Sequence, residues 1–460
     1  MIGFEIIVLW SDVLIWLLVV AGIGLGMLIA KNPPLLAAWR RVGANRVGMA
    51  SATVLLAFIL IGLLDSVHYR LQLDGKPGQK ASYAIEVLSV LDALAVPLRS
   101  RNEKTYSAPF ATRLYAKETI DLPGQGTVRD YPRLKHGGKH LEDRESELAA
   151  DAGFTAFKAM ALAFVGWLGV FAVVAAVNRE KDQKIGFGEM TFAWNAVLLT
   201  LLLILLCVVP LLWLSGQYHV FGTDKVGQDV LYQILKSVRT GLIIGLVTTL
   251  VMLPMAVLLG IIAGYFRGWV DDVIQYIYTV LNSIPGVLLI AAAVLMMQVV
   301  IDSHPQWFST AAERADLRLL ALCFILGITS WTGLCRLLRG ETLKLRELEY
   351  IQAAQAFGVS NGRIIIRHIL PNLMHIVIIA LVMDFSGLVL AEAVLSYVGI
   401  GVDPTMTSFG TMINNARMEL GREPVVWWSL AAAFSTMFIL VLAANLFADA
   451  VRDAFDPRAA

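Results

Sequence analysis

Runs of about twenty apolar residues recur along the sequence and constrain the fold more than any other feature. They lie at 4–30, 47–64, 155–177, 190–214, 241–265, 273–300, 319–338, 372–398 and 429–449. An apolar helix of about twenty residues crosses the hydrocarbon core of a bilayer. With 57% hydrophobic and 16% charged residues, the chain is too apolar for a soluble globular protein. We therefore predict an all-α polytopic membrane protein with about nine transmembrane helices.

Cationic loops predict which side of the membrane each loop faces. The first apolar run is followed by Lys31, Arg40, Arg41 and Arg46, with no acidic residue among them. Short loops rich in Lys and Arg stay on the cytoplasmic side. The first run has no basic segment before it and no clear cleavage site, so we expect a retained span rather than a signal peptide. The N-terminus is thus predicted outside and the C-terminus in the cytoplasm.

Residues 65–154 interrupt the series of apolar runs and are predicted to form an extracytoplasmic insert. Charges of both signs gather there, and Gly and Pro residues indicate loops. We expect residues 81–98 to form one amphipathic helix, because two acidic residues make this segment a poor span. His136 and His140 stand four apart, but the two glycines between them argue against a rigid metal-binding helix, so we predict no metal site.

The polar segment 341–371 separates two apolar runs and is predicted to be a helix–bend–helix elbow. Apolar residues at helical spacing predict a first helix over 342–357, after which Gly358 suits a left-handed C-cap. Ser360 is expected to cap a second helix that ends at Pro371. Basic residues in and before the segment favour a cytoplasmic position. From spacing alone, a helical hairpin lying on the membrane is favoured over a docking surface for a soluble partner.

The order of residues in this elbow resembles the cytoplasmic loop motif of ABC importer permeases. That motif reads Glu-Ala-Ala, three residues, Gly, nine residues, Ile, one residue, Leu-Pro. Gln352 replaces the Glu, and His368 stands where Ile is usual. The ending from His368 to Asn372 is similar to the dipeptide/oligopeptide branch of the family. The resemblance implies that the elbow docks a cytoplasmic ATPase through Gln352, Ala353, Ala354, Gly358, His368, Leu370 and Pro371.

A second resemblance lies in the loop that precedes the fifth apolar run. The stretch from His219 to Asp229, HVFGTDKVGQD, is similar to the His-x-x-Gly-Thr-Asp-x-x-Gly-Arg-Asp signature of the same branch, with Gln228 in place of its Arg. From the residues alone, Asp229 is expected to cap the helix that starts at Val230, and the glycines suit tight turns. The resemblance implies a contact with a substrate-binding protein. The candidate contact residues are Gly222, Thr223, Asp224, Gly227 and Asp229.

The resemblance extends nearly continuously from 218 to 458, including an inner turn at 267–272 and the tail at 452–458. It implies a six-helix ABC importer permease core at 190–460 with its coupling loop at 341–371. Three extra spans precede this core. We assign the first two spans to 1–64 and the third span, with a cytoplasmic loop, to 155–189. The extracytoplasmic insert at 65–154 lies between them.

Three polar or helix-breaking residues within the spans are candidates for the translocation path. Asp384 lies about 18 Å along the eighth apolar run by helix rise, near mid-membrane. An intramembrane carboxylate marks a candidate functional site. Glu392 lies nearer the outer face, and Pro285 interrupts the sixth run, where a broken helix is tolerated if it lines a cavity. For the two acids the alternative is a hydrogen-bonded packing role, and for Pro285 it is a simple kink.

The sequence contains no Gly-x4-Gly-Lys-Ser/Thr phosphate loop, so we expect no ATP hydrolysis by this chain through such a loop. The resemblance implies a permease subunit, not an enzyme, of an ATP-driven peptide importer in the bacterial inner membrane. No cofactor is expected on the chain itself, and ATP would be hydrolysed by partner subunits. The implied partners are a second homologous permease subunit, two cytoplasmic ABC ATPase subunits, an extracytoplasmic substrate-binding protein and membrane lipid, with no nucleic acid.

Two other classes of function stay open at this stage. A stand-alone secondary transporter or channel also fits an intramembrane Asp384 and a helix broken at Pro285. A membrane-embedded enzyme is disfavoured, because no nucleophile–base pair or metal cluster lies in the apolar runs. The cargo is left open among peptides, nickel complexes and oligosaccharides, and we expect dipeptides or oligopeptides.

Overall fold

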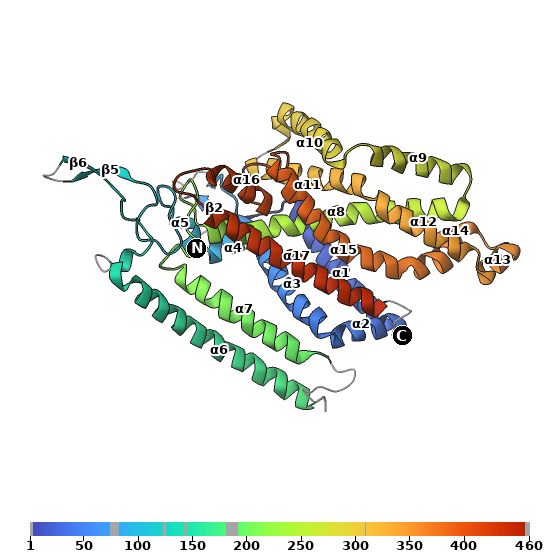
Figure 1. The fold of residues 1–460 in the computed structure, drawn as a ribbon. Coiled ribbons are helices and arrows are strands. Elements are labelled where there is room, and N and C mark those ends of the chain that lie inside the picture. The colour runs from blue at the N-terminus through green and yellow to red at the C-terminus, as the bar shows by residue number, and fades with distance from the viewer. Residues whose placement is uncertain are drawn as a thin grey trace. The chain divides into compact units, whose positions relative to one another are not determined.

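A computed structural model describes residues 3–73, 82–122, 126–141, 145–180, 192–308 and 310–455. The expected end of the tail at 456–458 and the expected loop at 181–189 therefore lie outside the described residues. Within the described ranges, nine helical stretches have the length and apolar composition needed to cross a membrane. They are Trp10–Lys31, Arg46–Leu64, Leu148–Asn178, Trp194–Leu214, Val230–Phe266, Gly286–Ser303, Ala311–Arg346, Asn361–Tyr397 and Trp428–Phe455. The prediction of an all-α polytopic protein with about nine spans is confirmed (Figure 1).

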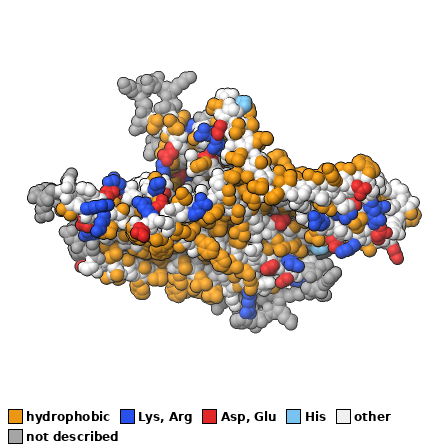
Figure 2. Space-filling view, turned by 45° about the horizontal axis from the view of Figure 1, so that its top comes forward, with side chains coloured by type: hydrophobic (Ala, Val, Ile, Leu, Met, Phe, Trp, Pro, Cys, Tyr) orange, Lys and Arg blue, Asp and Glu red, His pale blue; other side chains and the backbone are white. Residues whose placement is uncertain are grey.

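The chain forms two compact units that share several helices. Unit 1 consists of 1–8, 25–241 and 407–447, and unit 2 consists of 9–24, 242–406 and 448–460. Large hydrophobic side chains are exposed along the spans, and many are visible on the face in Figure 2. Such exposure is expected where lipid, rather than water, surrounds a helix.

The helices of unit 1 include a group of three spans that pack side by side. Helix α3 (Arg46–Leu64) contacts α7 (Trp194–Leu214), and α7 packs along α6 (Leu148–Glu180) (Figure 1). The indole nitrogen of Trp167 in α6 donates a hydrogen bond of 2.8 Å to the carbonyl oxygen of Leu198 in α7. Helix α2 (Pro33–Ala44) precedes α3, and α16 (Phe409–Glu419) also belongs to this unit.

Two small sheets and several short elements form the insert and the segment before the first span. Strand β2 (His68–Leu73) pairs antiparallel with β1 (Phe4–Ile7) on one side, and with β3 (Ser82–Tyr83) and β4 (Leu88–Ser89) on the other. Strands β5 (Glu118–Leu122) and β6 (Gly126–Asp130) form a separate hairpin. Short 3₁₀ turns follow at Lys139–Leu141 and Glu145–Glu147. The sequence analysis, which predicts an all-α fold, did not include these strands.

Two boundaries predicted from the sequence are wrong. The described part of 81–98 is not one helix, because Ser89 and Asp92 form a capping box that starts α4 (Val90–Leu94) only at residue 90, and α5 (Val96–Ser100) begins separately. The first apolar run, 4–30, is not one span either. Strand β1 takes its first residues, and helix α1 (Trp10–Lys31) begins only at Trp10.

Unit 2 holds the helices on either side of the elbow. The C-terminal half of α8 (Val230–Phe266) leads to α9 (Trp269–Ser283), and α10 (Gly286–Ser303) follows after a break at Ile284 and Pro285. This is the interruption that the sequence predicts. Next come a 3₁₀ turn at Pro305–Trp307, α11 (Ala311–Ser330), α12 (Thr332–Arg346), α13 (Glu349–Ala356), α14 (Asn361–Ile364), a π-helical turn (Ile365–Ile369) and α15 (Leu370–Tyr397). Helix α17 (Trp428–Phe455) ends the described chain.

Helices α8 and α12 approach closely because two glycines face α12. A Cβ atom added at Gly260 would lie 2.8 Å from the carbonyl oxygen of Cys335, and one at Gly264 would lie 2.6 Å from Cβ of Thr342. Glycines four residues apart let two helices in a membrane pack backbone to backbone. This contact fixes the C-terminal end of α8 against the helix that enters the elbow.

Candidate functional site

The first part of the elbow (residues 341–371) belongs to two helices rather than to the single helix that the sequence predicts. Helix α12 continues through its start and ends at Arg346, and α13 begins at Glu349. The predicted single helix over 342–357 is therefore wrong. The chain is extended at Leu348, with φ −71° and ψ 139°, and the guanidinium of Arg346 donates a hydrogen bond of 2.7 Å to the carbonyl oxygen of Tyr265. This contact with a distant part of the sequence holds the end of α12 apart from α13.

The bend at Gly358 occurs where the sequence predicts it. Gly358 has φ +74°, its N–H donates to the carbonyl oxygen of Gln355 (3.0 Å), and the N–H of Val359 donates to that of Ala354 (3.0 Å). These two bonds are those of a Schellman C-cap. Ser360 occupies the N-cap position of α14, but its side chain makes no capping hydrogen bond.

The second helix of the elbow does not end at Pro371, which corrects another prediction. The chain passes from the π-helical turn Ile365–Ile369 directly into α15, with Pro371 in the first turn of that helix. A proline has no N–H and its ring clashes with the carbonyl group four residues earlier. The wider π turn accommodates both effects, so the elbow continues into the next span without a break.

Tyr265, at the end of α8, connects both arms of the elbow and was not singled out from the sequence. Its side chain is buried, and its hydroxyl donates to Oδ1 of Asn361 (3.0 Å) and accepts from Nε2 of Gln355 (3.2 Å). Its carbonyl oxygen accepts the bond from Arg346 described above. The Gly-Tyr-Phe sequence just before the 267–272 turn is the sequence feature that could have pointed to Tyr265.

One face of the elbow is buried and the other is exposed. Ile351, Ile364 and Ile369 are fully buried in the core cluster of unit 2. Among the residues that the resemblance assigns to docking, Gln352, Ala353, Gly358 and Pro371 are exposed, while Ala354, His368 and Leu370 are half-buried. Phe357, which the sequence analysis did not select, is 87% exposed at the end of α13.

The two unusual motif residues make contacts within the elbow. The side-chain amide of Gln352 donates to the carbonyl oxygen of Glu347 (3.2 Å). The imidazole ring of His368 lies 6.0 Å from the ring of Tyr350, and Asn372 donates to the Tyr350 hydroxyl (3.1 Å). The His-Ile-Leu-Pro-Asn ending thus packs on α13, which helps to fix the angle of the bend.

The three candidate path residues have different surroundings. Asp384 is half-buried in α15, and its carboxylate has no hydrogen-bond or ion-pair partner among the described residues. Glu392 is 1% exposed and accepts a hydrogen bond of 2.6 Å from the hydroxyl of Ser396, an arrangement typical of a packing residue. Pro285 is exposed at the start of α10. The hydroxyl of Thr332, at the start of α12, donates to Asn282 (3.1 Å) beside this break.

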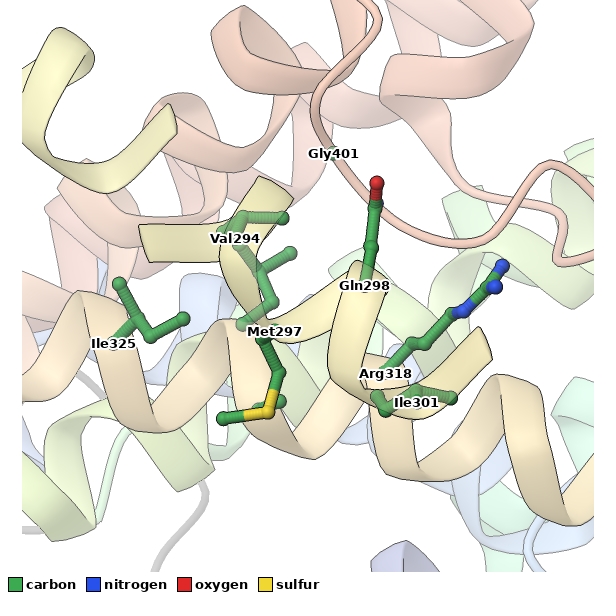
Figure 3. Close-up of a pocket in the computed structure, with 9 residues that line it drawn as sticks. Val294, Met297, Gln298, Ile301, Arg318, Ile325 and Gly401 are labelled. Atoms are coloured by element: carbon green, nitrogen blue, oxygen red, sulfur yellow. The ribbon is translucent and has the colours of Figure 1, made fainter. Parts of the chain in front are cut away.

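A shallow pocket lies between α10 and α11, and Figure 3 shows its lining. Val294, Met297, Gln298 and Ile301 of α10 and Arg318 of α11 face it, and Gly401 borders it. The guanidinium group of Arg318 is paired with the carboxylates of Asp302 and Asp403. None of the candidate residues from the sequence lines this pocket.

The second candidate surface is the outer loop (residues 218–229). The insert covers most of its motif residues. Thr223 is fully buried, and its hydroxyl accepts from the N–H of Ser107 (2.7 Å) and donates to the carbonyl oxygen of Thr105 (2.9 Å). Gly222 and Gly227 have φ values of +72° and +76°. A Cβ atom at Gly222 would lie 2.4 Å from the carbonyl oxygen of Ser107.

A buried cluster of three charged residues joins the insert to this loop. His219 is flanked by Asp229, 2.7 Å from Nδ1, and by Glu103 of the insert, 3.4 Å from Nε2. Glu103 also accepts hydrogen bonds from the backbone N–H groups of residues 135, 136 and 137. Asp229 accepts from the N–H of Leu231, which confirms that it caps α8.

The pKa values of His219 and Glu103 in this cluster favour their charged forms at neutral pH. Burial alone would lower the pKa of His219, but the hydrogen bonds to Asp229 and Glu103 outweigh it and raise that pKa to about 9. Burial alone would raise the pKa of Glu103, but its bonds to His219 and to the backbone lower it to about 2. The cluster is thus a buried imidazolium between two carboxylates.

The outer loop therefore holds the insert, a role that the sequence analysis did not assign to it. Asp224 is half-buried and binds the loop's own N–H groups at Val226 (3.0 Å) and Gln228 (2.8 Å). Only Lys225 and Val226 of the motif are exposed. Contact of this loop with a substrate-binding protein stays a prediction. Near it, His140 contacts Asp151 (2.9 Å) and the hydroxyl of Tyr218 (3.1 Å).

Comparisons with known proteins identify the family. The family described as "Binding-protein-dependent transport system inner membrane component" matches residues 256–460. The chain is similar to the oligopeptide transport system permease protein OppC of Mycobacterium tuberculosis, with 32% identity over 53% of this chain and 77% of the relative. It is also similar to the glutathione permease protein GsiD of Pectobacterium atrosepticum (34% identity; 52% and 73%). The dipeptide permease protein DppC of Alkalihalophilus pseudofirmus gives 33% identity over 52% and 72%.

A solved chain of the MetNI methionine ABC transporter, in inward-facing conformations, is more distant. It shares 16% identity, covers 49% of this chain and 96% of its own length, and has a TM-score of 0.36. The relatives of higher identity are all permease proteins, and each is covered over more than two thirds of its length. The chain therefore belongs to the family of binding-protein-dependent transport system inner membrane components, the permeases of peptide ABC importers among them.

Proposed function

We propose that this chain is one permease subunit of an ATP-driven ABC importer for peptides of the dipeptide or oligopeptide class. It would form half of the translocation path beside a second homologous permease subunit. Two cytoplasmic ABC ATPase subunits would hydrolyse the ATP, and an extracytoplasmic substrate-binding protein would deliver the peptide. The names of the relatives, which are oligopeptide, glutathione and dipeptide permeases, support this choice of cargo.

The proposal gives the chain a defined orientation in the bacterial inner membrane. The elbow and the C-terminus lie in the cytoplasm, and the N-terminus and the insert lie outside. The exposed side chains of Arg363 and Arg367 in the elbow support this orientation, because Lys- and Arg-rich loops are retained on the cytoplasmic side. The chain itself is not an enzyme in this proposal, and it binds no cofactor.

An exposed aromatic side chain at the tip of the elbow carries the proposal of ATPase docking. Phe357 is 87% exposed directly before the bend at Gly358. Moving a Phe side chain from water into an apolar contact is favourable by about 1.5–3 kcal/mol. A partner that covers Phe357 would gain this free energy. Because Arg363 and Arg367 are exposed on the same elbow, a protein surface fits Phe357 better than the apolar core of a bilayer does.

The elbow is also stiff enough to transmit a push from the ATPase to the spans. Its inner face is buried through Ile351, Ile364 and Ile369, and Tyr265 connects both arms to α8. The second arm continues through the π turn into α15, which carries Asp384. We propose Asp384 as a residue of the translocation path, because an unpaired carboxylate in a span suits the cationic amino terminus of a peptide. Pro285 and Glu392 are secondary path candidates.

The test compares Phe357→Ser with Met418→Ser. Met418 is 72% exposed on α16, so it is an equally exposed apolar side chain that the proposal leaves out of ATPase docking. We expect Phe357→Ser to weaken binding of the ATPase subunits by about 10- to 100-fold, from the burial energy of one Phe side chain. Met418→Ser should leave this affinity unchanged. Full ATPase binding and full ATP-driven uptake in Phe357→Ser would refute docking through this tip.

An uptake assay without the ATPase subunits distinguishes an ATP-driven importer from a stand-alone transporter. Uptake by vesicles that contain the permease subunits but no ATPase subunits should be absent. Peptide uptake at the full rate in such vesicles would support the secondary transporter or channel instead.

A further inference from the structure

The sheet that β1 and β2 form has one apolar face and one polar face. Phe4 lies opposite Leu71 and Ile6 lies opposite Tyr69 in the antiparallel register, so these four side chains share a face. On the other face Glu5 lies opposite Arg70, and Ile7 lies opposite His68. The rings of Phe4 and Tyr69 are in edge-to-face contact, with centroids 6.5 Å apart.

The apolar face is exposed within the described part of the chain. Phe4 is 65% exposed, Ile6 66% and Leu71 38%. Leu73, at the end of β2, is 51% exposed, and Val8, directly after β1, is 65% exposed. Contiguous exposed apolar side chains of this kind mark an interaction surface rather than a solvated one.

The lengths of two spans set the depth of this sheet. Helix α1 starts three residues after β1 ends, and β2 starts four residues after α3 ends. At about 1.5 Å per residue, the 22 residues of α1 and the 19 of α3 span roughly 33 and 28 Å. Both lengths match the roughly 30 Å of hydrocarbon in a bilayer. The sheet therefore lies directly outside the hydrocarbon, on the side from which α1 enters and to which α3 returns.

We propose that this apolar face rests on the membrane surface, among the lipid glycerol and upper acyl groups of the leaflet on the insert's side. The spans bring the sheet to that depth, and its aromatic and aliphatic residues are those that favour the interface. On the opposite face the exposed side chain of Glu5 meets water. The sheet thereby holds the base of the insert at a fixed height above the bilayer. This inference rests on the membrane-spanning fold and stands whichever cargo the protein carries.

Site-directed spin labels on the assembled transporter in nanodiscs test the contact. Single cysteines would be introduced at Phe4, Glu5 and Ile6, each in a Cys207→Ser background because Cys207 is exposed. Labels at positions 4 and 6 should be accessible to oxygen, which concentrates in lipid, and protected from a water-soluble nickel chelate. The label at Glu5 is the matched control and should show the reverse, so accessibility should alternate along β1.

Each other outcome overturns the proposal. Access of the nickel chelate to all three positions would mean that the face is in water. Protection of positions 4 and 6 from both reagents would mean that a protein surface covers it. A second measurement guards against damage by the label: Phe4→Trp should be quenched by brominated lipid more than Glu5→Trp, and equal quenching of both variants would also refute the contact.

Discussion

Deprotonating His219 should release the insert from the outer loop. The imidazolium lies between Glu103 of the insert and Asp229 of the loop, with its side chain 4% exposed. Its pKa is raised from 6.5 to about 9, because the bonds to the two carboxylates outweigh the effect of burial. A group whose pKa is raised in the folded state contributes stability that is full below the unfolded pKa and is lost as the pH rises through the folded value.

The size of the effect follows from the same two pKa values. A shift from 6.5 to about 9 corresponds to about 3 kcal/mol at low pH, since one pKa unit is about 1.4 kcal/mol. Most of this remains at pH 7, and little remains at pH 9.5. The free energy of opening the contact between 103–107 and the loop should therefore fall by about 2 kcal/mol between these pH values, or roughly 30-fold in the opening equilibrium.

Hydrogen exchange of the backbone amides in residues 103–107 measures this opening. The protection factor, which is corrected for the intrinsic pH dependence, should fall by the same 30-fold in the wild-type chain. In His219→Gln the protection should already be low at pH 7 and should change little up to pH 9.5. If both proteins lost protection in parallel, or if the wild type lost none, then the charge on His219 would not hold the insert.

Three further outcomes follow from other contacts. Gly227→Ala should destabilise unit 1 by about 2–3 kcal/mol in thermal unfolding, because the added Cβ atom would lie 2.0 Å from the carbonyl oxygen of Glu103. The control Gly286→Ala should be neutral, because no atom lies within 4 Å of the added Cβ there. Asp384→Asn should lower peptide uptake about tenfold, while Asp453→Asn, an exposed acid near the C-terminus, should not; normal uptake by Asp384→Asn would remove it from the path. Tyr265→Phe should loosen the elbow by about 1–2 kcal/mol through two lost hydrogen bonds, seen as reduced ATPase binding with unchanged membrane insertion.

Features fixed by neighbours in the sequence could be predicted from it. The left-handed C-cap at Gly358 depends on a glycine that follows a periodic helix, and Asp229 caps α8 through an N–H two residues away. The nine spans found among the described residues depend on composition over about twenty residues, so their number was predictable although their ends were not.

Features fixed by distant contacts could not be predicted in this way. The break between α12 and α13 is held by the carbonyl oxygen of Tyr265, about eighty residues before it in the chain. The helix propensities of residues 342–357 do not reveal this hydrogen bond. The passage of α15 through Pro371 was missed for a different reason: a π turn is too rare for a sequence pattern to indicate it. Gly260 and Gly264 did carry a usable signal, since their spacing of four is typical of close helix packing.

In the outer loop, the resemblance predicts the local conformation of the motif but not the surface that the motif contacts. Its glycines adopt positive φ and its aspartate caps a helix, and both follow from the residue types themselves. Its partner does not follow from them, because Glu103 and Ser107 of the insert occupy the surface that the resemblance assigns to another protein. A binding protein that docks here must meet the insert, Lys225 and Val226 rather than Thr223. Exchanging Lys225 and Val226 for Ser should then weaken binding-protein-stimulated ATP hydrolysis, whereas Thr223→Ser, which keeps the buried hydroxyl, should leave it unchanged.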